Sequence, residues 1–152
     1  MGLIVRVVAP ALAADAPAQP TNDQVIADIR TDLQAARADI VAKTMGLTAD
    51  QATKFWPVYQ KYQDGFSELF TQQLDLISKY ASSYEKLDDA GAVTLMNGQL
   101  DRDAKVAAYR TKWFLEFQKV LPGKVATKFM QIDRRLSLVT QVALAAQVPV
   151  VQ

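Results

Sequence analysis

Apolar residues recur along most of the chain at alternating intervals of three and four. This spacing is typical of α-helices that bury one face. It predicts four helices. The first opens at Thr21-Asn22 and ends at Gly46, and the second opens at Thr48 and runs for roughly 30 residues, or about 45 Å. The third opens at Asp88 or Asp89, and Pro122-Gly123 separates it from a fourth that stops near Gln147. No segment of useful length has the period of a strand, so the predicted fold class is all-α.

Each predicted helix has a stripe of apolar positions that we expect to be buried. The stripe of the second helix holds a 3-4 alternation over four heptads with one polar break, which resembles a coiled-coil seam. Because this helix is long and the loops are short, we expect an elongated, bent hairpin rather than a compact bundle of four equal helices. The stripes are Ile26, Ile29, Leu33, Ala36 and Ile40; Ala52, Phe55, Tyr59, Tyr62, Phe66, Leu69, Gln73, Leu76 and Tyr80; Val93, Met96, Leu100, Ala104, Ala107, Phe114, Phe117 and Leu121; and Val125, Phe129, Ile132, Leu136 and Val139.

Two helix starts carry the residues of a capping box. Thr21 with Gln24, and Thr48 with Gln51, can exchange hydrogen bonds between side chain and backbone. Gly46 is suited to the left-handed conformation that ends a helix. Asn97-Gly98 is expected to weaken the third helix near its start.

Pro57 lies well inside the second predicted helix. An interior proline removes one backbone hydrogen bond and costs roughly 3 kcal/mol. One interpretation is that Pro57 bends the helix, with Trp56 and Tyr59 packed beneath the bend. The alternative is that it only separates a short leading turn from the main helix.

The two ends of the chain differ in character from the predicted helical domain, residues 22–147. Residues 1–13 are predicted to be a signal peptide, because "VVAPALA" is apolar and Ala11-Leu12-Ala13 fits a cleavage site. Arg6 interrupts the apolar segment of residues 1–13, so a displaced start codon and an ordinary disordered tail remain alternatives. Residues 14–21 are expected to form a flexible mature N-terminus and residues 148–152 a tail.

Composition excludes several kinds of chemistry. The chain has no Cys and no His, which removes disulfides, thiol nucleophiles and the commonest general base. Its net charge of +1 gives no long-range attraction to nucleic acid. The apolar run near the N-terminus is too short for stable insertion into a membrane. With no tight carboxylate group and no Gly-rich phosphate loop, we predict no metal, no cofactor and no enzymatic activity.

A short motif and its second copy point to a family. Leu47-Thr48-x-x-Gln51 opens the second helix, and Ala-Thr-Lys-Phe follows at residues 52–55. The same four residues recur at 126–129, where they follow Leu121 at the distance at which the first copy follows Leu47. The chain resembles the LTxxQ family of periplasmic stress proteins, which includes Spy-type chaperones, over roughly residues 47–136. In the second copy Pro122 stands in place of Thr and Val125 in place of Gln, so the capping box is lost there.

The resemblance implies a fold and a function. Spy-like chains form thin, curved antiparallel dimers, so we expect a periplasmic homodimer that holds unfolded or stressed envelope proteins without ATP. The alternatives are an envelope-stress regulator that binds a sensor domain and a structural helical subunit without clients. Absence of His excludes the metal role of the zinc-responsive relatives.

Two sets of residues are candidates for contact with partners. The first is an aromatic-rich set on the second helix, which is expected either to form core and dimer seam or to contact clients. The second is a basic set, Lys105, Lys112 and Lys119, which belongs to a series of basic residues seven apart that includes Arg30/Arg37, Lys54/Lys61 and Lys128/Arg135. A solvated face is the ordinary interpretation of that series, and a basic surface for clients is the alternative. The first set is Phe55, Tyr59, Tyr62, Phe66, Leu69 and Phe70.

Overall fold

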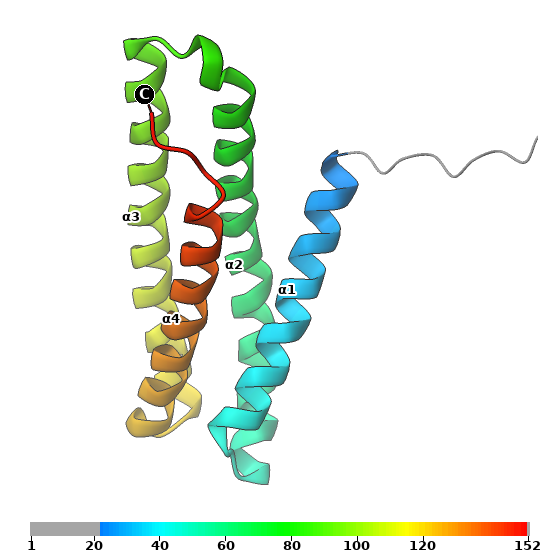
Figure 1. The fold of residues 1–152 in the computed structure, drawn as a ribbon. Coiled ribbons are helices and arrows are strands. Elements are labelled where there is room, and N and C mark those ends of the chain that lie inside the picture. The colour runs from blue at the N-terminus through cyan, green and yellow to red at the C-terminus, as the bar shows by residue number, and fades with distance from the viewer. Residues whose placement is uncertain (1–21, 152) are drawn as a thin grey trace, which may run out of the picture.

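The computed structural model describes residues 22–151, and this part of the chain is almost entirely helical (Figure 1). Its elements are α1 (Asn22–Met45), α2 (Ala49–Ser83), a short 3-10 helix η1 (Tyr84–Lys86), α3 (Asp89–Val120) and α4 (Gly123–Ala145). The described residues contain no strand, so the all-α prediction is confirmed. The predicted signal peptide and flexible N-terminus lie outside the described residues.

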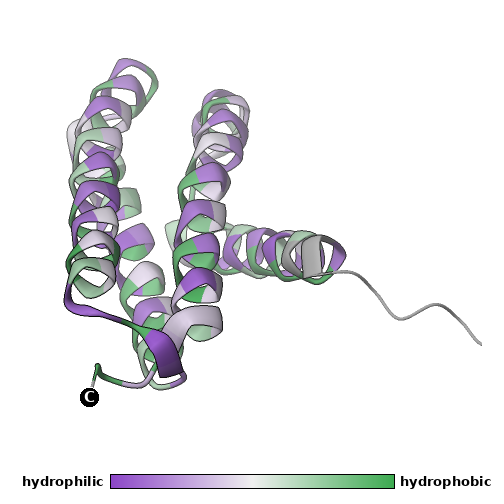
Figure 2. Ribbon diagram, turned by 90° about the horizontal axis from the view of Figure 1, so that it is seen from above, coloured by the Kyte–Doolittle hydropathy of each residue, from purple (hydrophilic) through white to green (hydrophobic). Residues whose placement is uncertain are grey.

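The four helices alternate in direction and form a ring, and side chains of α2 and α4 also meet in its centre. α2 packs against α1 and α3, and α4 packs against α1 and α3. The ring closes at the end of the molecule where α1 passes into α2, while the other end of α1 diverges from its neighbours (Figures 1 and 2). The long α2–α3 pair is therefore one part of a four-helix arrangement. The bent hairpin and the antiparallel dimer stay predictions.

The predicted helix ends are confirmed where the structure describes them. Thr48 Oγ1 accepts a hydrogen bond from Gln51 N at 3.2 Å, and Gln51 Oε1 accepts one from Thr48 N at 3.1 Å, which completes the capping box. Gly46 has a φ of 61°, the left-handed conformation that ends α1. Asp88 caps α3 through a 2.8 Å bond from Gly91 N. These local signals depend on neighbouring residues alone, which is why the sequence reveals them.

Aromatic rings from α2, α3 and α4 form the centre of the core. Phe55, Phe117 and Phe129 have no exposed surface, and the Phe117 and Phe129 ring centroids lie 4.4 Å apart. The repeated Ala-Thr-Lys-Phe segments bring Phe55 and Phe129 into edge-to-face contact at 5.2 Å. The repeat is thus a packing device, since it places equivalent rings from two helices in one core.

The predicted burial of α1 is wrong for three of its five positions, while Leu33 is half-buried. Ile29, Ala36 and Ile40 are exposed, whereas Val41 and Arg37 are buried. A prediction from the spacing of apolar residues cannot place a buried arginine on the inner face of α1. It therefore assigned the inner face to the wrong residues.

The predicted stripe of α3 is wrong in its first half, where Val93 and Leu100 are exposed while Arg102 and Val106 are buried. It is correct near the end of the helix, where Phe117 and Leu121 are buried. α3 runs through Gly98 without a break. A Cβ at Gly98 would lie 2.9 Å from Leu76 Cδ2, so glycine here permits a close approach of α2 and α3.

Pro57 lies on the exposed side of a continuous α2. The carbonyl of Thr53, which would accept a bond from the missing N–H, belongs to an exposed residue, so water can reach it. Trp56 packs on Tyr59 with ring centroids 5.2 Å apart. α2 is not divided at Pro57, so the alternative that this residue separates a leading turn is wrong; the bend stays a prediction.

We expect Pro57→Ala to raise the free energy of unfolding by up to about 3 kcal/mol, because it restores the missing backbone hydrogen bond. Urea denaturation of the two proteins measures the difference. A matched exchange at the exposed Pro122, which precedes α4 and needs no helical N–H, serves as the control. Equal or lower stability of Pro57→Ala would contradict this explanation.

Candidate functional site

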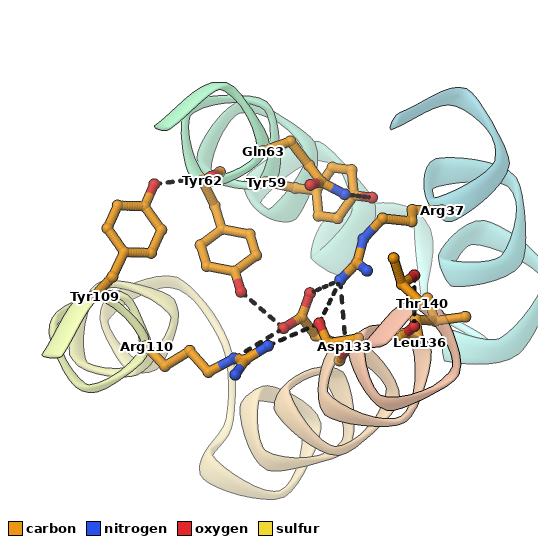
Figure 3. Close-up of polar contacts among 10 residues, drawn as sticks. Arg37, Tyr59, Tyr62, Gln63, Tyr109, Arg110, Asp133, Leu136 and Thr140 are labelled. Carbon is orange, nitrogen blue, oxygen red and sulfur yellow. Dashed lines mark hydrogen bonds and ion pairs between the residues drawn. The ribbon is translucent and has the colours of Figure 1, made fainter. Parts of the chain in front are cut away.

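A buried ion pair links the first and last helices. Arg37 of α1 pairs with Asp133 of α4, and the two residues are only 4% and 1% exposed. Arg37 Nη2 also lies 3.4 Å from the Asp133 carbonyl oxygen and 3.3 Å from Ser137 Oγ (Figure 3). A charge buried this deeply is tolerated only with close partners, so the pair fixes α1 against α4.

Two further helices contribute to the same cluster. The Tyr62 hydroxyl of α2 donates to Asp133 Oδ2 at 2.7 Å, and Arg110 Nε of α3 lies 3.4 Å from the same oxygen (Figure 3). Arg110 Nη2 donates to Ser137 Oγ at 2.7 Å. Asp133 thus connects all four helices.

The cluster holds more positive than negative charge. The guanidinium carbons of Arg37 and Arg110 lie 5.4 Å and 5.3 Å from the centroid of the Phe66 ring, within the range of cation–π attraction. Among the residues that the structure describes, Asp133 is the one carboxylate paired with either of them. Arg37 Nε is buried and has no hydrogen-bond partner among the described residues.

The tyrosines of the core stay neutral hydroxyl donors. Burial raises the pKa of Tyr62 far above its usual value of 10, and the neighbouring Asp133 charge raises it further. Burial also raises the pKa of Tyr109 to about 12. The Tyr109 hydroxyl donates to the Tyr62 carbonyl oxygen at 2.8 Å, which ties α3 to α2. The side chains of this cluster bind and orient one another. The Asp133 carboxylate already has three partners, Arg37, Tyr62 and Arg110.

The cap residues of the two motifs take different places. Leu47 is half-buried against the core, and Leu121 is buried in it. Pro122 precedes α4 as its cap and makes no side-chain hydrogen bond, as its residue type requires. These residues start helices and anchor the core.

The six predicted seam or client-binding residues all lie in the core of one chain. Helices α1, α3 and α4 of the same chain cover this stripe. None of them is exposed enough to contact a client in this conformation. The six are Phe55, Tyr59, Tyr62, Phe66, Leu69 and Phe70.

The predicted basic residues do share an exposed face of α3. Lys105 and Lys119 form 2.7 Å ion pairs with Asp101 and Glu116 on the same helix. Lys112 forms no ion pair with the described residues. We call this surface the α3 outer face, and it also includes three apolar residues that are each more than half exposed. Its members are Val93, Leu100, Lys105, Lys112, Leu115 and Lys119.

Arg37 is the residue that sequence reasoning placed most wrongly. Its spacing of seven from Arg30 indicated a solvated face, yet it is buried. Its partner, Asp133, lies 96 residues away, so no local pattern could reveal the pair. Arg102 and Arg110 were missed for the same reason.

Residues 22–151 contain neither a metal-binding cluster nor a membrane-spanning helix. No described group of three or more acidic residues is placed to hold a metal ion. No described helix combines the length and apolar character needed to span a membrane.

A scan against protein-family models finds no match for this chain, and searches of curated proteins and of solved structures find none either.

Proposed function

We propose that the protein is an exported, ATP-independent holdase that binds unfolded segments of other proteins on the α3 outer face. One observation carries the proposal: Val93, Leu100 and Leu115 are exposed on the helix that also presents three exposed lysines. From Val93 to Leu115 these side chains follow about 33 Å of helix at 1.5 Å per residue, a length along which an extended unfolded segment can lie.

The two kinds of residue have different physical roles. Apolar contact with Leu100 and Leu115 supplies affinity, because unfolded chains expose apolar side chains that fold away in native proteins. The lysines raise the rate of encounter with acidic segments of a client, and they do not fix the orientation of the bound client. Since the whole chain carries a net charge of only +1, this attraction is local and screened over about 8 Å at physiological ionic strength.

Export and dimerisation belong to the same proposal. The apolar segment at residues 1–13 supports export, and the resemblance to LTxxQ proteins supports both export and a homodimer. The dimer seam must lie outside the buried stripe of α2. Ile29 and Ile40 are exposed on α1, and with Leu33 and Ala36 between them they have the 4-3-4 spacing of a helical seam, so they supply a suitable surface.

Light scattering of a reduced or heat-stressed model client tests the proposal. We expect the mature protein to suppress aggregation at an equimolar ratio of dimer to client, with no nucleotide present. Combined Lys105→Glu, Lys112→Glu and Lys119→Glu should slow capture, and Leu100→Ser with Leu115→Ser should weaken it. The matched control reverses three exposed lysines of α2, Lys54, Lys61 and Lys79, and should keep full activity.

The outcomes separate the alternatives. Aggregation that proceeds unchanged at several-fold excess would overturn the holdase proposal and favour a regulator that binds a sensor domain. Suppression that ignores added salt, the α3 reversals and the leucine changes would keep a holdase but exclude the α3 outer face as its binding surface.

A further inference from the structure

Two adjoining cavities lie between the helices away from the α3 outer face. The first, of about 480 Å³, lies against the charged cluster and is lined by four arginines, Arg37, Arg102, Arg110 and Arg134. The second, of about 570 Å³, is bordered by α2, α3, α4 and the segment after α4. Both volumes fall in the range of small-molecule sites. The cavities share Arg102, Asp103 and Gln141, so they adjoin end to end.

The first cavity has an excess of positive charge. Asp103, which pairs with Arg102 at 3.2 Å, is the one acidic residue in its lining. Asp133 pairs with Arg37 and Arg110 from behind the lining. Four guanidiniums therefore face two carboxylates. Arg134 forms no ion pair with the described residues, and the buried Nε of Arg37 has no hydrogen-bond partner there.

The second cavity is apolar along most of its length. Its walls include Leu76 and Ile77 of α2, Leu95 and Met96 of α3, and Leu144 of α4. Residues 148–151, predicted as a tail, instead form part of its wall. Tyr80 and Tyr84 hold that segment by donating to the carbonyl oxygens of Pro149 at 2.9 Å and Val150 at 3.2 Å.

We propose that these cavities bind a single-chain fatty acid, with its carboxylate among the arginines and its acyl chain along the apolar groove. Arginine presents a rigid fork of donors that matches a carboxylate. Phe66 lines the first cavity and Tyr80 the second, and about 21 Å of α2 separates them at 1.5 Å per residue. This length suits an extended acyl chain. The charge at one end and the apolar walls at the other fit an anionic amphiphile better than a wholly apolar or wholly polar ligand.

Isothermal titration calorimetry of the full chain with laurate, below the critical micelle concentration of laurate, tests the site. We expect one laurate per chain with a dissociation constant of about 0.1 mM or tighter. Dodecyltrimethylammonium, which has the same tail and the opposite charge, should bind at least tenfold more weakly. A lysophosphatidate arm reports whether a phosphate headgroup replaces the carboxylate; tighter binding of that ligand would overturn the choice of a fatty acid.

Two variants locate the ligand. Arg134→Glu should weaken laurate binding about tenfold, and Met96→Glu should weaken it through the apolar groove. Lys124→Glu is the matched control, because it reverses one exposed charge of α4 outside the cavity lining. Thermal unfolding by circular dichroism verifies that each variant is folded. Absent laurate binding, or equal binding by Arg134→Glu and Lys124→Glu, would overturn the proposal.

Discussion

Replacing Asp133 with alanine will lower the free energy of unfolding by about 3–5 kcal/mol, the cost of breaking a buried ion pair from one side. The change leaves Arg37 without its carboxylate partner, in a site where it is only 4% exposed. It also removes the acceptor of the Tyr62 hydroxyl and the carboxylate partner of Arg110. Each of these groups must then stay buried and unpaired or draw water into the core.

Urea denaturation followed by circular dichroism measures the loss. Asp101→Ala removes a carboxylate whose side chain is 63% exposed and whose partner Lys105 is 55% exposed. It should change the stability far less, since exposed ion pairs contribute about 0–1 kcal/mol. Arg37→Met should cost less than Asp133→Ala, because Asp133 then keeps Arg110 and Tyr62 as partners. Similar stabilities of Asp133→Ala and Asp101→Ala would show that the cluster does not hold the four helices together.

Phe129→Ala will lower the free energy of unfolding by about 3–5 kcal/mol, as expected for a fully buried aromatic residue. Phe129 has no exposed surface and contacts the rings of Phe55, Phe117 and Tyr62. Its removal leaves a cavity at the point where the two repeated segments meet.

A double-mutant cycle isolates the contact between the repeats. Phe55→Ala combined with Phe129→Ala should give a coupling of about 0.5–1.5 kcal/mol, the range for aromatic pairs. Val139→Ala, at an exposed position of α4, is the control and should stay within about 0.5 kcal/mol of wild type. Purely additive losses for the two phenylalanines would mean that the repeat does not act as a packing unit.

Features that depend on nearby residues could be predicted from the sequence. The capping box of Thr48 and Gln51 involves two residues three apart, and the left-handed end of α1 depends on Gly46 alone. The stripe of α2 from Phe55 to Leu69 was also correctly predicted to be buried, because aromatic residues there follow a strict helical period. All-α architecture followed from the same periodicity.

Features that depend on partners distant in the sequence could not be predicted from it. Arg37 is buried because Asp133 reaches it from another helix, and its burial turns Ile29 and Ile40 outward. In α3 the inner face contains Gly98 and Arg102, neither of which an apolar count includes. For the same reason the candidate client surface differs from the predicted one. Aromatic residues of α2 fill the core, and leucines of α3 are exposed.

The choice of the α3 outer face as the binding surface depends on this difference between predicted and observed exposure. The lysines expected on a basic face are exposed on α3, and Val93 and Leu100 on the same face belong to the stripe that was expected to be buried. The α3 outer face therefore combines one predicted set with residues whose exposure only the structure reveals.

Photocrosslinking from single positions tests most directly whether clients contact the α3 outer face. A photoreactive amino acid replaces Leu115 of α3 in one protein and Val139 of α4 in another, and each protein is irradiated with an unfolded client. Both positions are exposed and apolar, so they differ chiefly in location. We expect a client adduct from Leu115 that is several-fold stronger than the adduct from Val139. Equal adducts from the two positions, or a stronger one from Val139, would contradict binding of clients on the α3 outer face.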